Sequence, residues 1–145
     1  MKKRLHRSDN SDTAIRAISV ADLERYGQSW LYENDYSQHS KTTLAIRRFL
    51  ISKLIWFLHY KNHAECGLLQ LREFMAYCSK GHEEPGGRWG NPQMTRPVRP
   101  RTVHTYHGHL RTFFRWLVKE EVITSSPMER IPPPVARRDQ LKPFR

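Results

Sequence analysis

Long apolar runs, a cysteine framework and a secretory leader are all missing from this sequence of 145 residues. No apolar stretch reaches the ~18–20 residues that a membrane-spanning helix needs, so we expect no membrane partner. The basic start, Met1 to Arg4, is not followed by the apolar segment of a signal peptide. The two cysteines, Cys66 and Cys78, are too few for a disulfide framework and fit a reducing compartment. The sequence therefore predicts a cytoplasmic protein.

Acidic residues are missing from two windows of an otherwise mixed chain. The formal net charge of +11 comes from 25 Lys and Arg against 14 Asp and Glu. Residues 36–64 carry five basic and no acidic side chains, and residues 85–119 carry seven basic and no acidic ones. Because carboxylates repel phosphates, a surface that binds nucleic acid needs this exclusion of acids. We therefore expect double-stranded DNA as a partner.

Apolar residues recur at helical spacing, and no segment shows a convincing strand pattern, so the fold class is predicted to be all-α. Ser19 and Ser40 are expected N-caps of helices that run to about residues 34 and 63. Further helices are expected at about 68–80, from an N-cap at Thr102 to about 121, and near 126–131. We interpret residues 1–17 as a flexible basic arm, 18–132 as the domain and 133–145 as a linker. Residues 81–100 hold four Gly and four Pro and predict a long loop, which is more often functional than idle.

The helix that follows Thr102 has one apolar arc and one acid-free outer face. The apolar arc, about 100° wide at 100° per residue, comprises Val103, Tyr106, Leu110, Phe113, Phe114 and Leu117. The outer face comprises Arg101, His104, Thr105, Gly108, Thr112 and Arg115, with Arg111 on one shoulder. A glycine in the middle of this face would allow another backbone to approach closely.

Other kinds of site are weaker on the residues alone. Possible zinc donors are His59, His63, Cys66, Cys78 and His82, but they lack a paired Cys-x2-Cys knuckle. Three histidines (His104, His107 and His109) surround Tyr106, yet no carboxylate between residues 85 and 119 could orient an imidazole for acid–base chemistry. We expect no metal and no cofactor.

The glycine-rich run 86–90 does not join a strand to a helix, so a nucleotide-cradling loop is disfavoured. This loop tip could touch DNA or a partner domain, or Trp89 could pack on the bundle. Aromatic residues that could stack on single strands have helical spacing, which favours a place in the core. They are Phe49, Trp56, Phe57, Phe113, Phe114 and Trp116.

The run from Thr102 to Leu117, with Ser126-Pro127-Met128 and Ile131-Pro132 after it, is distinctive. It resembles the end of the N-terminal core-binding domain of tyrosine recombinases, the phage integrase family. Residues that stand where that family places its Thr, Tyr, Leu-Arg, Phe and Pro are Thr102, Tyr106, Leu110, Arg111, Phe113, Phe114, Trp116, Leu117 and Pro127. The resemblance covers about residues 18–132. It departs from the family at Arg47, where an aromatic residue is usual, and in the length of the 81–100 loop.

This resemblance implies a SAM-like bundle of four to five helices, arranged as two crossed helical hairpins, that forms half of a clamp around duplex DNA. The helices after Ser40 and Thr102 would face the DNA. Catalysis in this family belongs to a separate C-terminal domain, and the chain reaches Arg145 within what looks like the interdomain linker. We therefore expect a non-catalytic chain, without catalytic residues, from a bacterial or phage-encoded DNA-cleaving and rejoining recombinase. Its partners would be the recombination site, the catalytic domain and other recombinase protomers on DNA.

The expected DNA contacts fall into two sets. Contacts to the phosphate backbone are expected from Lys41, Arg47, Arg48, Arg99, Arg101, Arg111 and Arg115. Groove edges are expected to be reached by Lys41, Thr43, His104, Thr105 and Gly108. Two alternatives stay open: a stand-alone helical DNA-binding regulator, and a helical protein-interaction module whose basic face meets an acidic partner.

Overall fold

The computed structural model describes residues 17–82 and 86–135 of the chain. Its elements are β1 (Ile18–Ser19), α2 (Val20–Tyr36), α3 (Lys41–Tyr60), β2 (Glu65–Cys66), α4 (Leu68–Ser79), α5 (Pro100–Lys119) and two single-turn 3-10 helices, η1 (Arg88–Gly90) and η2 (Pro127–Arg130). The predicted arm before Ala17 and the linker from residue 136 onward lie outside the described residues. The predicted all-α class is confirmed, with one addition: β1 and β2 form a two-residue antiparallel pair that the sequence did not indicate.

Serine caps start the first two long helices, as predicted. The Ser19 hydroxyl accepts from the Asp22 backbone N–H, and the Ser40 hydroxyl accepts from the Thr43 backbone N–H. The prediction for α5 was wrong, because the helix begins at Pro100 with Arg99 as its N-cap. Proline suits the first helical position because its fixed φ is already helical and its missing N–H has no partner there.

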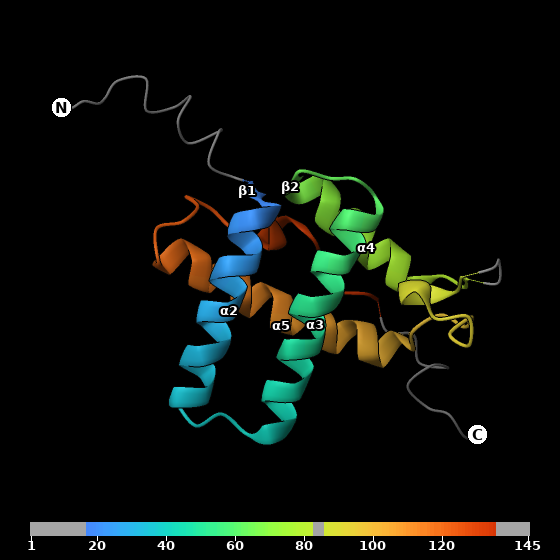
Figure 1. The fold of residues 1–145 in the computed structure, drawn as a ribbon, viewed down its shortest axis with the longest axis horizontal. Coiled ribbons are helices and arrows are strands. Elements are labelled where there is room, and N and C mark those ends of the chain that lie inside the picture. Colours follow the sequence, from blue (N-terminus) through green and yellow to red (C-terminus); the bar gives the residue numbers. More distant parts are fainter. Residues whose placement is uncertain (1–16, 83–85, 136–145) are drawn as a thin grey trace.

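The helices form two crossed layers (Figure 1). The antiparallel pair α2 and α3 lies in front, and α5 crosses behind both, with α4 beside it. Side chains from all four helices meet between the layers and are fully buried: Leu23, Leu54, Phe57, Phe74, Phe113 and Phe114. This shared core fixes the start of α3 relative to α5, the two segments from which the acids are missing.

The long loop between α4 and α5 is folded onto the bundle. Trp89 is buried and donates its backbone N–H to the Tyr77 hydroxyl at 3.0 Å. Its ring lies at 6.0 Å from the ring of Trp56 and 6.3 Å from that of Phe49, both nearly perpendicular. Of the roles considered for this loop, the packing of Trp89 on the bundle is thus the one that the structure shows.

Candidate nucleic-acid interface

The outer face of α5 is open to solvent along its length. Exposed residues of this helix include Arg101, His104, Thr105, Gly108, Arg111, Thr112 and Arg115, the same set that the helical angles predicted. At about 1.5 Å of rise per residue, the stripe from Arg101 to Arg115 is about 21 Å long. We call these seven residues the outer stripe.

The first half of α3 borders the outer stripe across a shallow groove. Apolar side chains of α3 and residues near the start of α5 line a space of about 470 Å³: Ala45, Ile46, Phe49, Arg101, Thr102, Thr105 and Tyr106. Elsewhere on α3, Lys41 and Arg48 are exposed, and Arg48 lines a separate hollow toward α2 that Glu24 also lines. Lys53 extends its amine over the Phe49 ring, 5.5 Å from the centroid. Cations from two helices therefore flank one groove.

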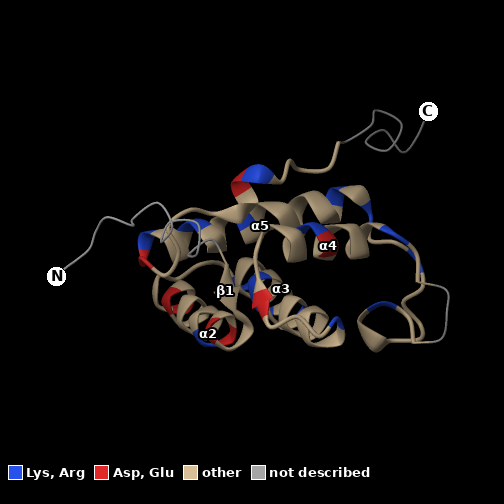
Figure 2. Ribbon diagram, turned by 90° about the horizontal axis from the view of Figure 1, so that it is seen from above, with Lys and Arg blue, Asp and Glu red and all other residues tan. Residues whose placement is uncertain are grey.

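Acidic side chains lie on other elements. Figure 2 shows red positions on α2, whereas the ribbons of α3 and α5 carry blue positions and no red ones. Two of the α2 acids have partners within the protein: Asp22 pairs with Arg25 at 2.9 Å, and Glu33 accepts the Trp116 indole N–H at 3.2 Å. The acid-free windows of the sequence thus become adjacent surfaces in the fold.

Arg47 was predicted to contact the DNA backbone, but the structure places it inside the protein with an exposed fraction of 9%. Its Nη1 donates to Asn34 Oδ1 at 3.0 Å and its Nε donates to His109 Nδ1 at 3.1 Å. The guanidinium also lies over the Trp30 ring, 4.8 Å from the centroid. Arg47 therefore joins α2, α3 and α5. Burial lowers its pKa, and burial together with the Arg47 charge lowers the pKa of His109.

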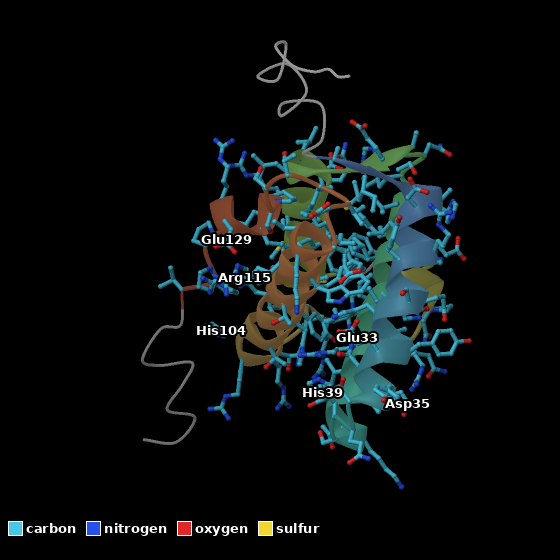
Figure 3. The ribbon with its side chains drawn as sticks, turned by 90° about the vertical axis from the view of Figure 1, so that its left-hand side faces the viewer. Glu33, Asp35, His39, His104, Arg115 and Glu129 are labelled. Carbon is cyan, nitrogen blue, oxygen red and sulfur yellow. The ribbon has the colours of Figure 1, made fainter. Side chains whose placement is uncertain are left out.

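The sequence of α5 alone had indicated that the outer stripe is free of acid. In the structure, an acid from another element lies against its C-terminal half. Glu129 of η2 meets Arg115 through two contacts, Nε to Oε2 at 2.6 Å and Nη2 to Oε1 at 3.3 Å. Arg111 Nη2 lies 3.7 Å from the same Oε1. These contacts lower the pKa of Glu129 and raise that of Arg115. Figure 3 shows Glu129 and Arg115 together on the outer side of α5, with His104 on the same side.

The residues predicted to reach the groove edges differ in exposure and in which hydrogen-bonding groups remain available to a ligand. His104 and Gly108 are exposed, and an added Cβ at Gly108 would meet nothing within 4 Å. Thr43 is half-buried in the cap of α3, where its Oγ1 accepts from the Ser40 hydroxyl at 3.0 Å. Thr105 is exposed, but its hydroxyl donates to the Arg101 carbonyl at 3.2 Å, which leaves only its lone pairs for a ligand.

The three histidines around Tyr106 have different surroundings and do not form one site. His104 is exposed, and His109 accepts from Arg47. His107 is 4% exposed, and its Nε2 lies 2.6 Å from the Ile131 carbonyl oxygen. Because helical angles do not reveal a partner 24 residues away, the burial of His107 was not predicted.

The possible zinc donors do not converge. His63 Nε2 contacts Glu73 at 2.7 Å, and His82 Nε2 lies 2.7 Å from the Tyr77 carbonyl oxygen. Cys66 and Cys78 are fully buried, and burial raises the pKa of the Cys78 thiol to about 12. Over residues 17–82 and 86–135, no three His, Cys, Asp or Glu side chains gather as a metal site.

No helix within these ranges has the length and apolarity to cross a membrane.

The aromatic residues considered as a stacking platform are mostly core residues. Phe57, Phe113 and Phe114 are fully buried, and Phe49, Trp56 and Trp116 are partly buried against the core. The spacing argument for packing is therefore confirmed.

No protein-family model, curated protein or solved structure significantly matches the chain.

Proposed function

We propose that this protein binds duplex DNA through the outer stripe of α5 and the first half of α3. The observation that carries the proposal is the juxtaposition of these two segments, which hold no Asp or Glu and share one groove. Arg101 of α5 lines this groove, and Lys53 of α3 lies over the ring of Phe49, which also lines it. Arg99, the N-cap of α5, and Lys41 and Arg48 of α3 are exposed on the same two segments. Such cations bind phosphates by releasing counterions, which gives affinity without sequence choice.

The dimensions of α5 suit a groove of B-form DNA. An α-helix with side chains is about 10–12 Å wide, close to the ~12 Å width of the major groove. The outer stripe, about 21 Å long, exceeds that width, so its two ends reach phosphates on both sides of a groove. His104, Thr105 and Gly108 lie between the ends, where the base edges would be.

Within this proposal the protein is the core-binding domain of a site-specific tyrosine recombinase that acts in DNA integration and recombination. Support for the recombinase identity is the resemblance of residues 102–132 to that family. The domain would grip one face of the recombination site and position a C-terminal catalytic domain, without performing a chemical step itself. A DNA ligand and two free, buried cysteines agree with a cytoplasmic location.

The test is fluorescence anisotropy with a labelled duplex of about 20 base pairs at several salt concentrations. We expect affinity to fall as salt rises, and Arg101→Gln to weaken binding and to reduce the slope of log K against log salt by about 0.9. The matched control is Arg72→Gln, which removes one exposed charge from α4 and should leave the slope unchanged.

The outcomes separate the alternatives. Equal losses from both variants, or equal affinity for heparin and duplex, would contradict a defined DNA surface and favour a module for acidic partners. A footprint on a promoter-like site rather than on a recombination half-site would favour a stand-alone regulator.

A further inference from the structure

The contact between α5 and η2 has the geometry of an occupied anion site. Arg115 presents Nε and Nη2 as a fork to the two Glu129 oxygens, and Arg111 approaches one of them (Figure 3). Arginine binds phosphates through the same two-pronged arrangement. The carboxylate of Glu129, from η2, thus occupies the place on the basic face of α5 where two phosphate oxygens would bind.

The carboxylate can leave without disturbing the fold. The side chains of Arg111, Arg115 and Glu129 are 45%, 55% and 42% exposed, so solvent and ligands reach all three. Other contacts hold η2 in place: Met128 is 1% exposed, and the Ile131 carbonyl oxygen lies 2.6 Å from His107 Nε2. Exposed ion pairs of this kind are weak, so a competing anion needs little free energy to displace one.

The position of this pair on α5 points to the identity of the competing anion. Arg111 and Arg115 lie at the far end of the outer stripe, about 21 Å from Arg101 to Arg115 at 1.5 Å per residue. A duplex that seats one phosphate strand near Arg101 brings the other side of the groove toward Arg111 and Arg115. Glu129 would then face a DNA phosphate at close range, and like charges repel.

We propose that Arg111 and Arg115 form a phosphate-binding site that Glu129 occupies in the free protein and that a DNA backbone phosphate takes over on binding. The inference rests on the proposed function and adds to it an internal competitor. Glu129 lowers the affinity of this end of α5 for DNA, and Arg111 and Arg115 bind DNA only where a phosphate is placed to displace the carboxylate.

The test compares Glu129→Gln with the wild-type protein in the duplex titration. Neutralising the carboxylate should tighten binding about 2- to 5-fold at low salt, since an exposed pair no longer has to be broken. The salt slope should steepen by about 0.9, one added phosphate contact. A further Arg115→Ala substitution in the Glu129→Gln background should abolish the gain. The matched control is Glu65→Gln, which removes one exposed acid from β2.

The Arg115 Nε–Hε signal in an NMR spectrum gives a second readout. It should shift in Glu129→Gln, and in the wild type it should move on addition of duplex. If Glu129→Gln binds like the wild type while Arg101→Gln weakens binding, the inference is wrong and the proposed function stands. Absence of duplex binding by the wild type and every variant would overturn both.

Discussion

Gly108 offers a substitution for which folding and DNA binding should respond in opposite directions. It lies in the middle of α5, is exposed, and an added Cβ would meet nothing within 4 Å. Glycine inside a helix costs about 0.5–1 kcal/mol relative to alanine. Gly108→Ala should therefore stabilise the free protein by about that amount and raise Tm by about 2–4 °C. Thermal unfolding followed by circular dichroism measures this shift.

The effect on DNA binding depends on how closely the duplex approaches the outer stripe. Gly108→Gln keeps a good helix former at this position but places a long side chain where the groove would meet the helix. If the backbone at Gly108 contacts the duplex, this variant should weaken binding about fivefold, the loss of a contact worth about 1 kcal/mol. Ala76→Gln, at an exposed position of α4, is the matched control and should bind like the wild type.

Two results would refute this reasoning. A Tm that falls in Gly108→Ala would mean that α5 meets a constraint at this position that the open surroundings do not show. Unchanged affinity in Gly108→Gln, with a raised Tm, would mean that the duplex does not contact the middle of the outer stripe.

The buried Arg47 network gives two further predictions. Arg47→Ala should lower the free energy of unfolding by about 2–4 kcal/mol, because Asn34 and His109 lose their donor inside the protein. Denaturant unfolding measures this loss, with Arg48→Ala, at the exposed neighbouring position, as the control. If Arg47→Ala loses no more stability than Arg48→Ala, the network is contradicted. Because the pKa of His109 is lowered in the folded protein, the His109 imidazole binds a proton more readily in the unfolded chain than in the folded protein. Its contribution to stability is complete above about pH 6.5 and declines as pH falls toward the folded pKa. His109→Gln, which retains an acceptor, should flatten this part of the stability–pH curve, and an unaltered curve would count against the assignment.

Much of the fold could be predicted because its signals are local. Helical spacing placed the inward residues of α5 apart from His107, and two serines marked the starts of α2 and α3. The start of α5 was misplaced at Thr102 because Arg99 makes no side-chain cap contact there. Pro100 at the first helical position was the signal that could have corrected it.

The errors at the candidate site involve partners that are distant in sequence. Arg47 meets His109 across 62 residues, and Arg115 meets Glu129 across 14 residues and a turn. A cation that forms an internal network and one that faces solvent look alike in a helical projection. Only the packing of α2, α3 and α5 distinguishes Arg47 from Arg48, and only the path of the chain after α5 brings an acid to the outer stripe.

The most direct test of DNA binding by this surface is an amide-shift titration by NMR with a duplex of about 20 base pairs, at low and moderate salt. We predict that shifts concentrate on residues 99–115 and 41–48 and fade as salt rises. Shifts that are absent, or that concentrate on α2 or α4 instead, would contradict the assignment of α3 and α5 as the DNA-binding surface.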